Sequence, residues 1–402
     1  MSKRNKVAAI DVGTTKVCTI MGDVDGEGQL RVLGVGVGPS QGLQKGLVVN
    51  VNEAKEAIRE SIKKAERTAG YKLESAYIGV TGRHISSVNN HGVIAITRND
   101  QLVKPADLKR VLQVARTVKI PADHKVLHII PRTYVVDGQE GVKNPVGMHG
   151  FRLDVEAHII TAAVTSVQNL TKCVRGLGIE IDDLVMEPLA SAEAVLSEEE
   201  RTDGVMIADI GGGTTDIAVM KEDTICHTSV LPVAGHLITR DISVGLGLSP
   251  ELAESMKKKY GNVSPNQEMA VDADRTLTED GHSVSYRDLS EIIRIRVEEL
   301  VRLIMMELPR TDYSKFIPAG LVLTGGSANL AGIAELAQEI ARVPVRVGEP
   351  VSLYGVSDTL KDPAYATSVG LLLWKMRNQS VHTWVPQSGI RAALSQMFRI
   401  FK

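Results

Sequence analysis

The same short pattern occurs twice in this chain, at positions separated by nearly half of its 402 residues. Residues 8–23 read AAIDVGTTKVCTIMGD, and residues 207–223 read IADIGGGTTDIAVMKED. In each copy an apolar run leads to an aspartate, a Gly-Thr-Thr turn follows, and a second run rich in β-branched residues comes after it. This order predicts a β-hairpin. A repeat this long exceeds the period of solenoid proteins, so it indicates two similar domains that face one another.

Segments of helix and strand character alternate between and after the two hairpins. Apolar residues recur at helical spacing in 52–68, 104–118, 165–177, 187–196 and 289–308, and short apolar runs at 75–82 and 321–326 indicate strands. Residues 262–287 are polar and predict a surface excursion. The alternation predicts an α/β fold in which helices flank the sheets.

The expected domain boundaries lie where the alternation of helix and strand segments is interrupted. Residues 83–162 hold short β-like pieces around one helix, which predicts an inserted subdomain, and 377–388 lack periodicity, which is typical of a linker. The expected order is 1–82 for the first half of domain 1, 83–162 for the insertion, 163–195 for the return to domain 1, 196–376 for domain 2 with a small subdomain at about 228–312, 377–388 for the linker and 389–402 for a terminal helix.

Composition excludes several classes of protein. The chain has 46 basic and 48 acidic residues and a formal net charge of −2, which argues against a strongly basic nucleic-acid binder. No apolar run approaches the roughly 18 residues of a transmembrane helix. The 3 cysteines are odd in number and widely separated, so they predict neither a disulfide framework nor a zinc site and suit a reducing cytoplasm.

Three glycine-rich turns carry the predicted chemistry. Turns of Gly and Thr present successive backbone N–H groups that bind anionic oxygens. The aspartates before the two hairpin turns, Asp11 and Asp209, suit a Mg²⁺ ion that bridges carboxylates and phosphates. The third turn, LTGGSANLAG at 323–332, leads into a helix whose N-terminus favours negative charge. One such turn is usually only a turn, but the three in this order predict a site for a nucleotide triphosphate and its metal ion.

Five motifs together resemble the ATPase superfamily of actin, Hsp70 and the sugar kinases. They are IDVGTTK and ADIGGGTTD for the phosphates, EPLASAEAVL and DPAYATSVGLLL for two connecting helices, and LVLTGGSANLAGI for adenosine. Within the superfamily the chain most closely resembles the FtsA family of bacterial cell-division actin homologues, from Lys6 to Lys402. The resemblance implies an actin-like fold with two similar domains around a nucleotide cleft, an inserted small subdomain and a C-terminal amphipathic helix.

The resemblance also implies which residues form the site. Asp11 and Asp209 would hold Mg²⁺ through water molecules. The residues that contact phosphate would be Gly13, Thr14, Thr15 and Lys16 on one side and Gly211, Gly212, Gly213, Thr214 and Thr215 on the other. Gly325, Gly326 and Ser327 would line the nucleoside pocket. Glu254 and Lys257 match residues that contact the ribose or base, although Glu and Lys on a helix also fit a solvated face.

Glu187 opens the first connecting helix and is the candidate catalytic residue. It matches the glutamate that positions or deprotonates the attacking nucleophile in the chaperone branch, but an acidic residue that caps a helix would look the same. Slow ATP hydrolysis is therefore the most that is expected.

The last residues form a separate amphipathic pattern. At ~100° per residue the apolar face of a helix would hold Ile390, Leu394, Met397, Phe398 and Phe401. The polar face would hold Arg391, Arg399 and Lys402. Such a helix is about 21 Å long, too short to span a bilayer, and its pattern is typical of a helix that lies in the interface of an anionic membrane. The alternative is a terminal helix docked on its own domain.

The function implied by the resemblance is that of an ATP-binding cell-division protein. It would polymerise at the cytoplasmic face of the cell membrane, at the division site, where it would tether the ring of FtsZ and recruit later division proteins. Its partners would thus be FtsZ, further copies of itself, anionic lipids and later division proteins, with no nucleic acid. Two alternatives stay open: a scaffold ATPase of a pilus or secretion assembly, and a small-molecule kinase of the same superfamily.

Overall fold

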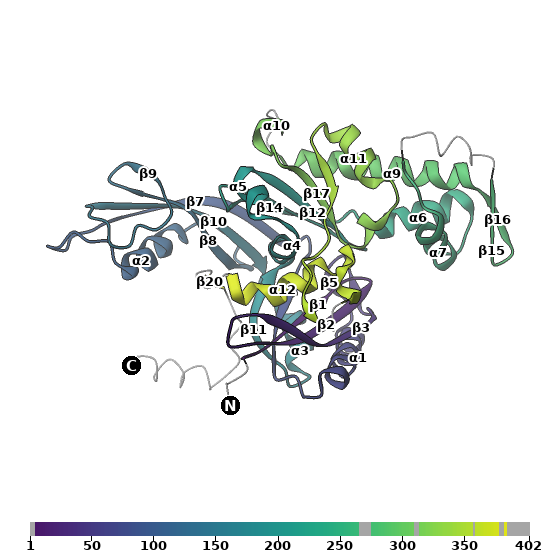
Figure 1. Ribbon diagram of the computed structural model, residues 1–402, viewed down its shortest axis with the longest axis horizontal. Helices are drawn as coiled ribbons and strands as arrows, with labels where there is room; N and C mark the ends of the chain where they lie inside the picture. Colours follow the sequence, from purple (N-terminus) through teal and green to yellow (C-terminus); the bar gives the residue numbers. More distant parts are fainter. Residues whose placement is uncertain (1–4, 265–274, 309–312, 357, 378–381, 384–402) are drawn as a thin grey trace.

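The computed structural model describes residues 5–264, 275–308, 313–356, 358–377 and 382–383. The predicted amphipathic helix at 389–402 lies outside these residues. Figure 1 shows two central sheets, a third sheet that extends to one side and a group of helices on the other side. In the part of the chain that is described, no helix is both long enough and apolar enough to cross a membrane.

The sheet of domain 1 contains the first hairpin. Its order is β11 (Glu180–Met186), β6 (Ser75–Val80), β1 (Asn5–Val12), β2 (Lys16–Val24), β3 (Leu30–Pro39) and β19 (Tyr354–Gly355). β1 and β2 pair antiparallel with Asp11 opposite Cys18, as the sequence predicts. Two helices, α1 (Val51–Ala69) and α3 (Val164–Arg175), and a short hairpin, β4 (Leu43–Gln44) with β5 (Leu47–Val48), accompany it. The predicted stripe of α1, including Ala54, Ile58 and Ile62, is buried.

The sheet of domain 2 contains the second hairpin in the equivalent place. Its order is β14 (Thr224–Leu231), β13 (Thr215–Lys221), β12 (Val205–Ile210), β17 (Gly320–Thr324) and β18 (Val345–Val347). β12 and β13 pair with Asp209 opposite Asp216. The chain of domain 2 also forms the helices α5 (Glu198–Asp203), α10 (Tyr313–Phe316) and α11 (Ile333–Ala341) and the 3-10 helix η1 (Gly326–Asn329). Two further 3-10 helices, η2 (Asp358–Lys361) and η3 (Pro363–Tyr365), precede the last of the described helices. The repeat in the sequence is thus a repeat in the fold.

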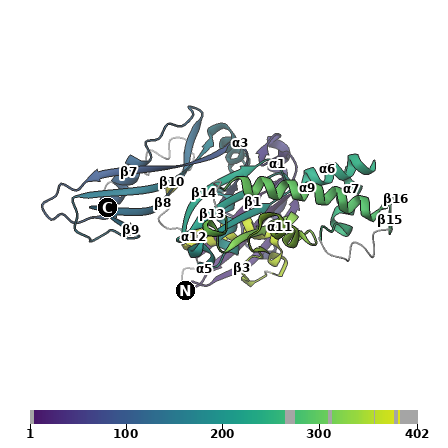
Figure 2. The ribbon, with the colours of Figure 1, turned by 90° about the horizontal axis from the view of Figure 1, so that it is seen from above.

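The small subdomain of domain 2 lies at one end of the molecule. It consists of α6 (Gly235–Leu246), α7 (Pro250–Tyr260), α9 (Tyr286–Met306) and the hairpin of β15 (Thr276–Glu279) and β16 (His282–Ser285). Figure 2 shows it at the opposite end from the inserted sheet. The polar stretch predicted as a surface excursion therefore includes a regular hairpin, and α9 begins three residues before the predicted helix because Ser285 caps it.

Two connecting helices, α4 (Glu187–Val195) and α12 (Ala366–Arg377), pack against one another between the domains. Small residues permit the close approach that the sequence predicts. A Cβ atom added at Gly370 would lie only 1.7 Å from the carbonyl oxygen of Ala190, so the two backbones are in direct contact. The helices therefore join the domains with no side-chain layer between them at this point.

The inserted subdomain has its own sheet and core. It contains β7 (Ile85–Ala95), β8 (His124–Val136), β9 (Gln139–Val142), β10 (Arg152–Ala163) and α2 (Pro105–Ala115). β20 (His382–Thr383) pairs with β8, so the predicted linker is not wholly without structure. Together with the two hairpins, the inserted sheet confirms the predicted architecture.

Side chains of the inserted subdomain cover β14, the edge strand of the domain 2 sheet. Ser87 Oγ donates to the carbonyl of Thr228 at 2.8 Å, and Asn89 Nδ2 donates to that of Cys226 at 3.1 Å. The buried His158 ring lies between Asn89 Oδ1 at 2.6 Å and Thr228 Oγ1 at 3.0 Å. The insertion is thus attached to domain 2 by hydrogen bonds and to domain 1 by the chain itself.

Candidate functional site

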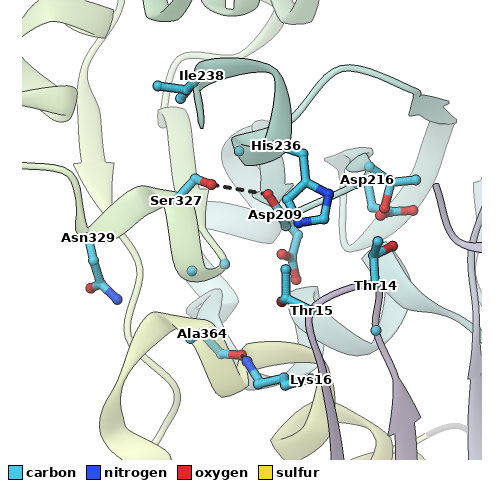
Figure 3. Close-up of a pocket in the computed structure, with 18 of the residues that line it drawn as sticks. Thr14, Thr15, Lys16, Asp209, Asp216, His236, Ile238, Ser327, Asn329 and Ala364 are labelled. Atoms are coloured by element: carbon cyan, nitrogen blue, oxygen red, sulfur yellow. Dashed lines mark hydrogen bonds between the residues drawn. The ribbon is translucent and has the colours of Figure 1, made fainter. Parts of the chain in front are cut away.

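A cavity of about 520 Å³ lies between the two hairpins, within the usual range for small-molecule sites. Figure 3 shows Thr14, Thr15 and Lys16 of the first hairpin together with Asp209 and Asp216 of the second. The cavity lining includes every predicted metal, phosphate and nucleoside residue except Thr215. The side chain of Thr215 is buried, and its hydroxyl donates to the carbonyl of Val233 at 2.7 Å.

The tips of the two hairpins are in close contact. A Cβ atom at Gly212 would lie 2.3 Å from Thr15 Cγ2, and one at Gly213 would lie 2.5 Å from Thr14 Oγ1. Real Cβ atoms do not approach other atoms this closely, so a larger residue at either position would displace the threonine side chain opposite it. The domains therefore bring two turns rich in N–H and hydroxyl groups to one place.

The start of α6 orients the second hairpin turn. The amide of Gly235 donates to Gly211 O at 3.0 Å, that of His236 donates to Gly212 O at 2.8 Å, and Ser327 Oγ donates to Gly211 O at 3.0 Å. In a trans peptide the N–H group points opposite to the carbonyl. The N–H groups of Gly212 and Gly213 therefore point away from α6, and no hydrogen bond from either group is found among the described residues.

Hydroxyl groups of the connecting helices hold the two predicted metal aspartates. Ser368 Oγ on α12 donates to Asp11 at 2.6 Å. Asp209 accepts from Ser191 on α4 at 2.6 Å and from Thr367 on α12 at 2.8 Å. Both carboxyl groups are buried, and burial raises the pKa of each. A bound cation would offset this penalty, so the donor set fits Mg²⁺.

Two more buried acids extend the site. Burial raises the pKa of Asp216 to about 7, and Asp216 accepts a hydrogen bond from Thr81 of domain 1. Burial and the neighbouring Asp216 raise the pKa of Glu187 well above its ordinary value. Glu187 is the first residue of α4, and it lines the cavity. Its carboxyl group therefore lies in the same cavity as the predicted phosphate and metal residues, and its catalytic role stays a prediction.

Lys16 is the cation of the first hairpin. Its ammonium group donates to the carbonyl of Ala364 and lies 4.4 Å from the centre of the Tyr365 ring. It also lowers the pKa of Asp11, against the larger effect of burial. Four buried carboxyl groups thus face a single lysine at this end of the cavity, which again favours a divalent cation.

Glu254 and Lys257 lie on α7 at the nucleoside end of the cavity. Lys257 Nζ is 2.6 Å from Glu254 Oε2, and it donates to Gly235 O at 3.2 Å and to Thr239 Oγ1 at 2.9 Å. Neither side chain is fully exposed, so they do not form a plain solvated face. The third turn completes this end through Gly325, Gly326 and Ser327.

Several residues of the site lack a prediction from the sequence. They are Thr81, Ser191, Asp216, His236, Thr367 and Ser368. Ser191, Thr367 and Ser368 stand inside EPLASAEAVL and DPAYATSVGLLL, where small residues indicate close helix packing and the second role of their hydroxyl groups as hydrogen-bond donors is easily missed. Asp216 follows the Thr-Thr pair of ADIGGGTTD directly, which is the signal that could have identified it.

Two family models match the chain. The model described as "Cell division protein FtsA" matches residues 206–370, and "SHS2 domain inserted in FTSA" matches residues 82–161. The second match falls on the inserted subdomain.

Solved structures of actin-like proteins share the fold at low sequence identity. One from the PilM–PilN type IV pilus biogenesis complex has a TM-score of 0.62 at 17% identity and covers 91% of this chain and 97% of its own. MreB5 of Spiroplasma citri bound to ADP has a TM-score of 0.56 at 13% identity, with coverage of 92% and 96%. At such identities these structures show the fold alone.

Curated relatives share sequence over almost the whole chain. The cell division protein FtsA of Pseudomonas aeruginosa is 44% identical over 93% of this chain and 90% of its own length. The FtsA proteins of Escherichia coli K12 and Bacillus subtilis 168 are each 35% identical, over 92% and 95% of this chain and 90% and 86% of their own. The chain therefore belongs to the FtsA family of actin-like cell-division proteins.

Proposed function

We propose that this protein binds ATP with Mg²⁺ in the cavity between its two domains. The single observation that carries the proposal is that two glycine-threonine turns, each preceded by a buried aspartate, meet at one cavity. Donors for phosphate oxygens and carboxylates for a hydrated cation are thus present together.

Different residues of the cavity would contact the metal ion, the phosphates and the nucleoside. Asp11 and Asp209 would hold Mg²⁺ through its water molecules, and the ion would neutralise part of the phosphate charge. The two turns would bind phosphate oxygens, while Gly325–Ser327, Glu254 and Lys257 would contact the nucleoside. Lys16 would exchange the Ala364 carbonyl for a phosphate oxygen, since a cation gains more from an anion than from a neutral acceptor.

Slow hydrolysis fits the acidic end of the cavity. Glu187 and Asp216 both have raised pKa values, and either carboxylate would take a proton from an attacking water molecule. Burial favours the protonated form of both carboxyl groups. A protonated carboxyl group is a poor base. We therefore infer turnover that is at most slow.

The cellular role we propose is attachment of the division ring to the membrane. The terminal segment 389–402 would lie in the cytoplasmic face of an anionic membrane, subunits would polymerise there, and the polymer would tether FtsZ and recruit later division proteins. Membership of the family supports this role, together with the amphipathic sequence of the segment.

Calorimetric titration with Mg-ATP tests the nucleotide site. Asp11→Ala and Asp209→Ala should weaken binding because each removes a carboxylate from the metal, and Gly212→Val should weaken it because the new side chain collides with Thr15. Gly26→Val is the matched control, since a Cβ atom there meets nothing within 4 Å. Unchanged affinity in all three site variants would exclude this cavity as the nucleotide site.

A pull-down assay tests the cellular role separately. The full chain on anionic vesicles should retain FtsZ, and a chain ending at Gln387 should not bring FtsZ to the vesicles. Retention by both chains would show that the segment 389–402 is not the tether.

A further inference from the structure

His236 lies beside the contact between the tips of the two hairpins. It is the second residue of α6, and its amide holds Gly212 O. A Cβ atom at Gly212 would lie 3.4 Å from His236 Nε2 and 2.3 Å from Thr15 Cγ2. The imidazole therefore stands beside the point where the two turns meet, and Figure 3 shows it reaching over this point from α6.

The His236 ring is available for a ligand, whereas other polar side chains of the cavity are engaged. Lys257 and Lys258 both pair with Glu254, and Lys16 is bonded to Ala364 O. In contrast, no hydrogen bond to the His236 ring is found among the described residues, and the residue is exposed in the open cavity. It is a donor without a partner at the phosphate end of the site.

The negative charge of the cavity creates a need for a further hydrogen-bond donor such as the His236 ring. Four buried carboxyl groups line the same space, so a polyphosphate that enters needs donors beyond the metal ion. Partial burial of the ring lowers the pKa of His236 and favours the neutral form, Glu254 opposes this shift, and Lys257 and Lys258 add to it. A neutral imidazole still has one N–H group to donate.

We propose that His236 is a further ligand-contacting residue, whose imidazole donates a hydrogen bond to the phosphate chain of the bound nucleotide. The inference rests on the proposed ATP site and adds a contact to it. It predicts that the ring contributes to affinity as a donor and not through its shape.

Titration of the full chain with Mg-ATP compares three variants. His236→Leu keeps an apolar side chain of similar size without a donor and should weaken binding about tenfold, the effect of one hydrogen bond to a charged group. His236→Gln places an N–H group at similar reach and should recover most of this loss. His282→Leu, at an exposed position on β16, is the control and should bind as the parent does.

The outcomes distinguish a failure of the His236 contact from a failure of the proposed ATP site. Failure of the parent chain to bind Mg-ATP overturns the proposed function itself. Normal binding by the parent and by His236→Leu overturns only the role of His236, and so does an equal loss in the Leu and Gln variants. Melting temperatures without nucleotide should agree among the variants, and if the Leu variant does not fold, His236→Ala takes its place beside His236→Gln.

Discussion

Thr81 donates a hydrogen bond to Asp216 across the cleft, from the end of β6 in domain 1 to β13 in domain 2. Both side chains are buried, and they are 135 residues apart in the chain. The bond therefore joins the two sides of the cavity directly. Because Asp216 is an acid of raised pKa, the strength of this junction depends on pH.

The first prediction is that Asp216→Asn stabilises the nucleotide-free protein, and more so at pH 8 than at pH 5. Asp216 has a pKa of about 7 in the folded protein and an ordinary value of 3.8. Between these values the folded state binds a proton that the unfolded state does not, so stability falls as pH rises through this window. Asparagine removes the effect, with a gain of up to about 4 kcal/mol at pH 8.

Thermal unfolding in the presence of a chelator measures this gain. Thr81→Val is the companion variant, because it removes the hydrogen bond but keeps the carboxyl group and should only destabilise. A gain from Asp216→Asn that is the same at both pH values would contradict the raised pKa.

The second prediction concerns the attachment of the inserted subdomain. Burial lowers the pKa of His158 from its ordinary value of 6.5 to about 3. Between these two pH values the unfolded chain binds a proton on this residue and the folded protein does not. Stability is therefore lost as pH falls from about 6.5 towards 3. His158→Gln keeps polar atoms near Asn89 and Thr228 without a titrating group, and should reduce the loss between pH 7 and pH 4 by up to about 3 kcal/mol.

Denaturant titrations at the two pH values provide the measurement. His282→Gln serves as the control because His282 is exposed and should leave the pH dependence unchanged. Parallel pH profiles for the parent and His158→Gln would show that this ring does not control the loss.

The third prediction is that Gly370→Ala destabilises the protein by about 1–3 kcal/mol or more, as overpacking does. The added methyl group would collide with the Ala190 carbonyl and force α4 and α12 apart. Gly26→Ala introduces the same methyl group where it meets nothing within 4 Å. Chemical denaturation of both variants is the measurement, and equal stability of the two would show that the helices separate freely.

The fourth prediction concerns the terminal segment. Phe401→Glu puts a charge on the apolar face, where full burial of one large side chain contributes about 1.5–3 kcal/mol, and should release the protein from vesicles while ATP binding persists. Ser395→Glu adds the same charge to the polar face and should matter far less on neutral vesicles. Flotation separates bound from free protein. Flotation of a chain ending at Gln387 would favour the docked-helix alternative.

Hairpins and helices could be predicted because their signals are local. The two Gly-Thr-Thr turns and the apolar stripe of α1 each lie within one short segment of sequence. Contacts between distant segments carry no such signal. Ser368 reaches Asp11 across 357 residues, and Ser87 reaches Thr228 across 141. Such partners follow only from the way the domains pack, so the sequence indicates the phosphate turns but not the hydroxyl groups that position their aspartates.

The cover over β14 has a consequence for solubility. An edge strand with open carbonyl groups is a template for a strand of another molecule. Ser87 and Asn89 occupy the outward carbonyls of Thr228 and Cys226, so the edge is blocked in the intact chain. A chain from which 83–162 is deleted would present these groups to its neighbours and should aggregate even where each remaining domain is folded. The insertion should therefore prevent aggregation through the edge of the domain 2 sheet.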